Sequence, residues 1–197
     1  AAMDFVSNIH RITRSTTSGN NYAVVTRVAT FNDRTARLAH TPLPPAFSVA
    51  GSALAGVTLL LLALFTWRMG RADMTLLASV WLSATPLISP VCWDIYLLWC
   101  SFLPWLVLWA HVTNRRRPIL AQASRAVRML VWTALPASYL LAGTFGNTSF
   151  TDLKRGVTVH LDLPLWMDEL PLVGHFLLVG ALLTVTVLDH RRAGAER

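Results

Sequence analysis

Five long apolar runs without a formal charge make up nearly half of this chain, and they limit how it can fold. A helix needs about 20 apolar residues to cross the ~30 Å hydrocarbon core of a bilayer. The five runs have this length or nearly so, and they are residues 47–66, 74–93, 95–113, 129–146 and 172–188. We therefore predict an all-α polytopic membrane protein with about five transmembrane helices, of which the last two are short.

Composition excludes several other classes of protein. Charged residues make up 14% of the chain, against about 25% in soluble domains, and disordered chains are poor in apolar residues. The net charge of +7 does not indicate nucleic-acid binding, because the basic residues lie between apolar runs and form no single stripe. Cys92 and Cys100 would be roughly 12 Å apart on one helix, too far for a disulfide, so we expect two free thiols.

The distribution of arginines predicts the orientation in the cell membrane. Short loops rich in Lys and Arg stay on the cytoplasmic side. With the N-terminus external and the C-terminus cytoplasmic, the inside segments hold Arg68, Arg71, Arg115, Arg116, Arg117, Arg125, Arg128, Arg191, Arg192 and Arg197. The chain then divides into an external segment, 1–46, and a transmembrane bundle, 47–197, with an external loop at 147–171.

The two external segments carry weaker signals. After Tyr22, apolar residues recur at near-helical spacing until the prolines at 42–45, which predicts a short amphipathic helix at the membrane interface. Arg27, Arg34 and Arg37 could share one face of it, either as a solvated or lipid-phosphate-binding surface or as part of a site. Residues 157–163 alternate apolar and polar side chains, as a short strand does.

The start of the sequence indicates a longer protein. It begins with Ala-Ala, and residues 1–21 contain no apolar stretch of signal-peptide length. An odd number of crossings with an external N-terminus is unusual for a complete protein. We therefore expect the chain to be the C-terminal part of a polytopic protein.

The stretch 84–99 is the most informative part of the chain. Pro86 and Pro90 break the helix as it reaches the external face, and Asp94 is the only formal charge between Asp73 and Arg115. An acid at such a depth is costly and marks a candidate functional site. The alternative is a carboxylate that caps the N-terminus of the third membrane helix, where the helix dipole favours an anion.

Two motifs resemble those of a GT-C glycosyltransferase family, the polyprenol-phosphate-mannose-dependent α-mannosyltransferases of actinobacterial envelopes and their relatives. Ser89-Pro90-Val91-Cys92-Trp93-Asp94 resembles the family's Ser-Pro-x-Ser-Trp-(Asp/Ser)-His-His motif. Upstream, the stretch from Gly19 to Arg27 resembles its Gly-Asn-Gln-Ser-Leu stretch, which an arginine follows. The His-His pair is replaced here by Ile95-Tyr96, and the family's catalytic Asp would precede residue 1, so the catalytic base is outside this chain.

The resemblance implies transfer of a hexose, with mannose as the expected sugar, from a polyprenyl phosphate to a lipid-linked glycan on the external face. Arg27 would hold the departing phosphate through its fork of N–H donors, and Asn20 and Asn21 would donate hydrogen bonds to phosphate or sugar. Asp94 and Tyr96 would bind sugar hydroxyls. Trp93, or Trp99, would stack on a sugar ring or prenyl chain.

No cofactor or metal is expected, because the six histidines are scattered and no nucleotide-binding loop is present. Expected partners are the lipid-linked donor and acceptor, membrane lipids, and the rest of the enzyme or other membrane subunits. Two alternatives stay open. The first is a non-catalytic subunit of a larger complex. The second is a transporter, against which stands the absence of a second intramembrane charge to pair with Asp94 and of a matching broken helix in another half.

Overall fold

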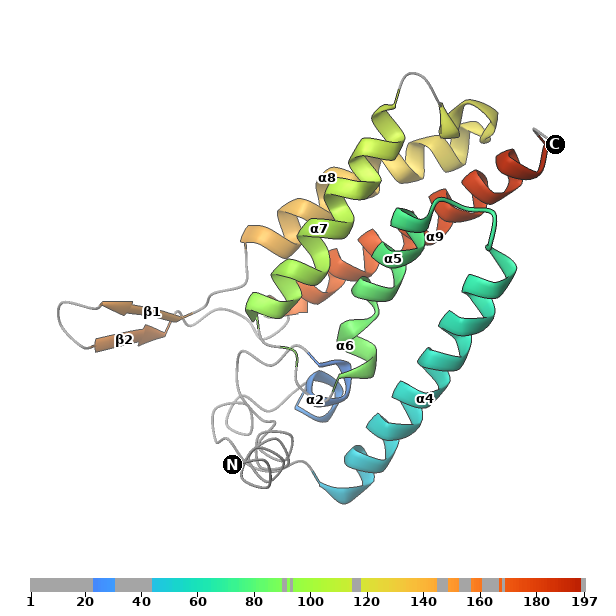
Figure 1. Ribbon diagram of the computed structural model, residues 1–197. Helices are drawn as coiled ribbons and strands as arrows, with labels where there is room; N and C mark the ends of the chain where they lie inside the picture. The colour runs from blue at the N-terminus through green and yellow to red at the C-terminus, as the bar shows by residue number, and fades with distance from the viewer. Residues whose placement is uncertain are drawn as a thin grey trace, which may run out of the picture. The chain divides into compact units, whose positions relative to one another are not determined.

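The computed structural model describes residues 23–30, 44–89, 92, 94–114, 118–144, 149–152, 157–160, 167 and 169–195. By contacts the chain divides into two compact units. The first unit contains Ala1–Gly70 and Trp81–Cys100, and the second contains Arg71–Val80 and Ser101–Arg197. Helices dominate the described residues of both (Figure 1).

Helix α4, Pro45–Arg68, is the long apolar helix of the first unit. It begins with a proline in its first turn, where the missing N–H costs nothing, and it has no proline after that turn to interrupt it. Only 11% of its most apolar window is buried, so nearly the whole helix is free to face lipid. The crossing predicted at 47–66 is confirmed as a helix of sufficient length.

The apolar run 74–93 is not one continuous helix, which corrects the second predicted crossing. Helix α5 runs from Met74 to Ser83, and the four-residue helix α6 from Thr85 to Ile88 follows it. Pro86 sits in the first turn of α6, where a proline is tolerated. The same ring would clash inside a longer helix. The break expected from the prolines is therefore present, and it lies at Ala84, between α5 and α6.

Helix α7, Asp94–Thr113, confirms the third predicted run. Helix α8, Arg125–Thr144, follows the 3₁₀ helix η1, Ile119–Gln122. Helix α9, Leu170–Ala195, is 26 residues long, so the prediction of a short fifth helix is wrong. The helix continues through the charged tail, where Asp189 and Arg192 lie three residues apart and pair with each other.

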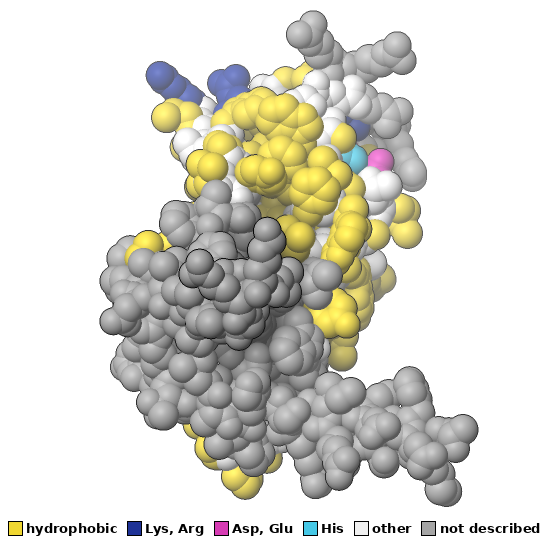
Figure 2. Space-filling model, turned by 90° about the vertical axis from the view of Figure 1, so that its left-hand side faces the viewer, with side chains coloured by type: hydrophobic (Ala, Val, Ile, Leu, Met, Phe, Trp, Pro, Cys, Tyr) yellow, Lys and Arg dark blue, Asp and Glu magenta, His cyan; other side chains and the backbone are white. Residues whose placement is uncertain are grey.

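Three helices in the described part of the chain are long and apolar enough to cross a membrane: α4, the Tyr96–Thr113 part of α7, and α9. The broken α5–α6 segment does not reach this length. Helix α8 has the length, but Arg125 and Arg128 in its first turn lower its hydropathy. Hydrophobic side chains cover most of the described surface seen in Figure 2. The chain is therefore built as a helical multi-pass membrane protein.

Two short strands accompany the helices, within the loop that the charge pattern placed outside. Ser149–Asp152 forms β1 and Val157–His160 forms β2, and the two pair in antiparallel register with Ser149 opposite His160. The strand predicted from alternation at 157–163 is confirmed for its first four residues. Residues 161–163 lie outside the described ones.

The second unit is held together by close packing of α8 against α9 and by aromatic side chains between α7 and α8. A Cβ atom at Gly174 of α9 would lie 2.7 Å from the backbone nitrogen of Ala142 on α8. The indole nitrogen of Trp105 on α7 donates a 2.9 Å hydrogen bond to the carbonyl of Leu135 on α8. The ring of Trp105 also contacts Tyr139, 5.2 Å away between ring centres. These contacts hold α8 against α9 and α7 against α8.

Candidate functional site

Among the residues predicted to bind substrate, Arg27 is one whose helix and side-chain burial the structure describes. It lies on α2, Val24–Ala29, and its side chain is buried, with 3% of its surface exposed. Neighbouring Thr26 and Thr30 are equally buried, and the hydroxyl of Thr30 donates a 2.9 Å hydrogen bond to the carbonyl of Thr26. An ionised group buried this deeply has to be paired or hydrogen-bonded. The burial of Arg27 contradicts a solvated face at this residue. A lipid-phosphate face is not tested, and Arg34 and Arg37 lie outside the described residues.

Helix α2 packs against α4 and α6 within the first unit. Its approach to α4 is close: a Cβ atom on Gly51 would lie 3.4 Å from a methyl carbon of Val25. Its other contact is with α6, Thr85–Ile88, the helix that precedes Ser89. Helix α2, which contains the last described residues of the upstream motif, thus packs in the same unit against the short helix that ends just before the downstream motif.

The downstream motif is described only in part. Cys92 is buried and lies outside any helix, so the assumption of one helix holding both cysteines is wrong. Neither cysteine is in a disulfide, as expected. Asp94 is the first residue of α7, a position that agrees with both the capping and the binding interpretation. The side chains of Asp94 and Trp93, and all of Asn20 and Asn21, lie outside the described residues.

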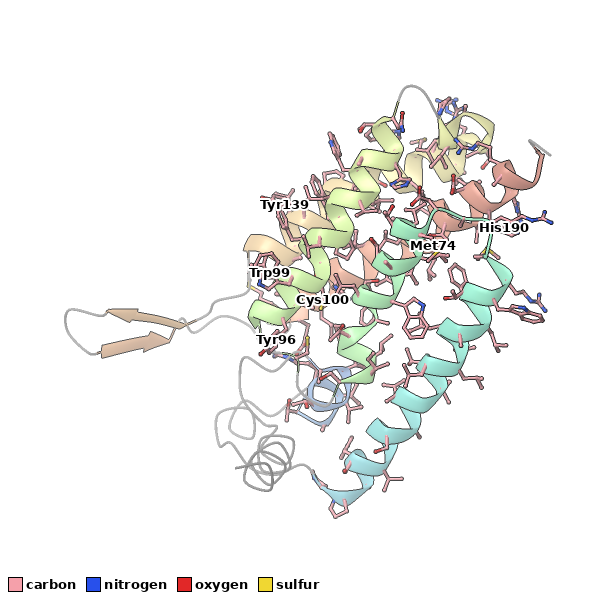
Figure 3. All side chains as sticks on the ribbon, in the orientation of Figure 1. Met74, Tyr96, Trp99, Cys100, Tyr139 and His190 are labelled. Atoms are coloured by element: carbon pink, nitrogen blue, oxygen red, sulfur yellow. The ribbon has the colours of Figure 1, made fainter. Side chains whose placement is uncertain are left out.

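Tyr96 and Trp99 are both exposed on the first turns of α7, at 54% and 52% (Figure 3). Their rings are therefore available to a sugar, a prenyl chain or lipid. Both residues lie, like Arg27, in the first unit. In the described part of the chain, no group of three or more His, Cys, Asp or Glu side chains could hold a metal ion.

Sequence reasoning missed a polar cluster in the second unit. The residues come from the start of α5, the ends of α7 and α9, and η1, and they line a pocket of about 200 Å³: Arg71, Asp73, His111, Asn114, Ile119, Asp189, Arg192 and Ala193. Arg71, Asp73 and the tail of α9 had been placed on one side of the membrane by the arginine pattern. The sequence signal for this cluster was that its charged residues lie at helix ends that are expected on the same side of the membrane.

Asp73 makes several of the polar contacts in and around this cluster. Its Oδ1 accepts hydrogen bonds from the backbone N–H and the hydroxyl of Thr75, at 2.8 and 2.6 Å, and so caps α5. Its Oδ2 lies 3.7 Å from Nε2 of His111. The backbone N–H of Asp73 donates to Asp189, which is paired with Arg192 at 3.1 Å. In Figure 2 a histidine and an acidic side chain are visible side by side.

The pKa of the Asp73 carboxyl lies below its ordinary value. The hydrogen bond from the Thr75 hydroxyl is the largest cause, and the backbone bond from Thr75 and the nearby His111 add to it, while partial burial opposes them. Asp73 is therefore ionised at neutral pH and forms part of a balanced set of positive and negative groups.

A second buried polar pair lies inside the same unit. The hydroxyl of Ser101 on α7 lies 2.7 Å from Nδ1 of His175 on α9, and both residues are buried. A serine beside a histidine can serve as nucleophile and base. The pair links α7 to α9 in the interior of the second unit.

These helices define the class of the protein, a helical multi-pass membrane protein. Comparisons with protein-family models, with curated proteins and with solved structures found no match to this chain. The function therefore has to be argued from the residues themselves.

Proposed function

We propose that this chain is the C-terminal portion of a membrane glycosyltransferase that moves a hexose from a polyprenyl phosphate to a lipid-linked glycan on the external face. Mannose is the expected sugar. The observation that carries the proposal is the contact between α2, which holds the buried Arg27, and α6, which leads into the Ser-Pro motif. A phosphate-binding cation and a sugar-binding segment have to be neighbours in such a site.

The chemistry assigns a role to each group. The acceptor hydroxyl attacks the anomeric carbon, the bond from that carbon to the phosphate oxygen breaks, and the polyprenyl phosphate leaves with the electron pair. Arg27 stabilises the charge that develops on this phosphate, as an oriented guanidinium does best. Asn20 and Asn21 assist it, and Trp93, Asp94 and Tyr96 hold the sugar. The base that takes the hydroxyl proton comes from outside this chain.

Substitution of Arg27 tests the phosphate-binding role. Arg27→Lys keeps the charge but loses the two-pronged geometry, and we expect transfer to fall about tenfold to a thousandfold. Arg68→Lys, at the exposed end of α4, is the matched control and should be mild. Transfer is measured in vesicles holding the complete protein and is normalised to folded protein by thermal denaturation in detergent. Normal transfer by folded Arg27→Lys would contradict the role.

Asp94→Asn separates sugar binding from helix capping. Asn caps a helix as well as Asp does, so the variant should fold normally under either interpretation. As a sugar ligand, Asp94 accepts hydrogen bonds from hydroxyls, and its loss should lower transfer strongly. Near-normal transfer would leave Asp94 as a cap only. If the complete protein transfers no sugar from any polyprenyl phosphate, the chain is a non-catalytic membrane subunit.

A further inference from the structure

We propose that the polar pocket of the second unit binds the headgroup of a zwitterionic phospholipid that carries a primary ammonium group and a phosphate. The pocket holds about 200 Å³. A water molecule takes up about 30 Å³ in the liquid, so there is room for a polar group of several heavy atoms. This site is distinct from the one around Arg27 and does not depend on the proposed transfer reaction.

The place of the pocket in the fold points to a lipid. Its lining comes from the last turn of α7 and the last turns of α9, two helices that are long and apolar enough to cross a membrane. Asp73, which precedes α5, lies beside them. The ends of membrane-spanning helices lie at the level of the polar headgroups. The pocket therefore opens where a phospholipid headgroup is the most abundant polar ligand.

The charges of the lining select the kind of headgroup. Asp73 and Asp189 contribute two carboxylates, and Arg71 and Arg192 contribute two guanidiniums. Asp189 and Arg192 already pair with each other at 3.1 Å. The Asp73 side chain is 43% exposed, and the guanidinium of Arg71 reaches α9, where its Nη1 would lie 3.3 Å from a Cβ atom on Gly194. One accessible acid and one accessible base thus share a small pocket.

A zwitterion satisfies both of these groups at once. Arg71 can bind phosphate oxygens through two parallel N–H donors, while an ammonium group donates to the Asp73 carboxylate. A purely anionic headgroup would be repelled by Asp73 and Asp189. A choline headgroup has no N–H to donate to a carboxylate, so a primary ammonium is preferred.

The experiment counts lipids retained by the purified chain in native mass spectrometry. The chain is exchanged from detergent into equal mixtures of phosphatidylethanolamine, phosphatidylcholine and phosphatidylglycerol. We expect one phosphatidylethanolamine to be retained about tenfold over the other two, which corresponds to about 1.4 kcal/mol. Arg71→Gln should abolish this preference. Arg125→Gln, an exposed arginine on α8 outside the pocket, should keep it.

Asp73→Asn gives the sharpest outcome, because it removes the charge while keeping the helix cap. The pocket then carries a net positive charge, and the preference should shift to phosphatidylglycerol. Equal retention of the three lipids by the wild-type chain would overturn the proposal. So would a first preference for phosphatidylglycerol, an equal effect of Arg71→Gln and Arg125→Gln, or displacement of the lipid by an equal concentration of soluble phosphoethanolamine.

Discussion

The Ser101 hydroxyl and Nδ1 of His175 form a 2.7 Å hydrogen bond between α7 and α9 in the interior of the second unit. Replacing Ser101 by Ala removes one partner of a buried ring nitrogen, and we expect a loss of about 1 kcal/mol in the free energy of unfolding. The measurement is thermal denaturation in detergent. Ser52→Ala is the control, because Ser52 is exposed and its hydroxyl bonds only within α4.

A double-mutant cycle checks that this loss comes from the pair. In a His175→Leu background, Ser101→Ala should cost almost nothing, since its partner is already gone. An equal cost in both backgrounds would show that Ser101 acts through packing and not through the histidine.

Gly174 permits a close approach of α8 to α9. A Cβ atom there would lie 2.7 Å from the Ala142 nitrogen and 2.9 Å from the Ser138 carbonyl oxygen, both of them backbone atoms. Gly174→Ala should therefore destabilise the second unit by about 1–3 kcal/mol. Gly180→Ala on the same helix meets nothing within 4 Å and should be neutral or stabilising. Equal midpoints of thermal denaturation for the two variants would contradict the close packing.

Asp73 makes stability depend on pH in the acid range. Its pKa is lowered in the folded protein from an ordinary value of 3.8. Its contribution is therefore fully present above that value and is lost as the pH falls through the lower, folded-state pKa. We expect the thermal midpoint of the wild-type chain to fall more between about pH 6 and about pH 2.5 than that of Asp73→Asn, which cannot titrate at this position.

Thr75→Val tests whether the Thr75 hydroxyl is the cause of the lowered pKa of Asp73. It removes the hydroxyl that lowers the pKa most, so the acid-dependent loss should become smaller than in the wild-type chain. The same pH dependence in all three proteins would exclude Asp73 as its source.

The predicted orientation can be tested with membrane-impermeant maleimide on intact cells. His160→Cys, on β2, should be labelled from outside, and Gly194→Cys, in the last turn of α9, only after the cells are opened. The unsubstituted chain provides the control, since Cys92 and Cys100 are buried and should stay unlabelled. Labelling of the Gly194 variant in intact cells would reverse the orientation.

Much of the helical fold could be predicted from local patterns. The run 47–66 and the run 95–113 read as helices because each is continuous in apolar residues, and a helix satisfies its own backbone groups in lipid. The extra length of α9 could not be predicted from apolar residues, because its last turns contain the charged residues Asp189, Arg191 and Arg192. The break after Ser83 was placed too late, because the proline that ends a helix acts on the turn before it.

The polar cluster could not be predicted in the same way. Asp73 and Asp189 lie 116 residues apart and meet through a single backbone hydrogen bond. His111 is added from a third segment. Periodicity reports which face of one helix is apolar, but it contains nothing about which helix ends share a side until the helices are packed. For Arg27, local sequence offered a surface and a site as alternatives, and its burial depends on packing between helices.

The break between α5 and α6 has a consequence for the order in which the chain assembles. Helix α4 satisfies its own backbone hydrogen bonds and can insert into a bilayer alone. At the junction of α5 and α6, Pro86 has no N–H to donate to the Leu82 carbonyl, which instead accepts a 2.7 Å hydrogen bond from the Thr85 hydroxyl. The backbone hydrogen bonding of a continuous helix is therefore interrupted here, and lipid offers no partners in its place. The contact of α6 with α4 shields part of this junction from lipid. We therefore expect α4 to enter the membrane first and α6 to pack against it afterwards.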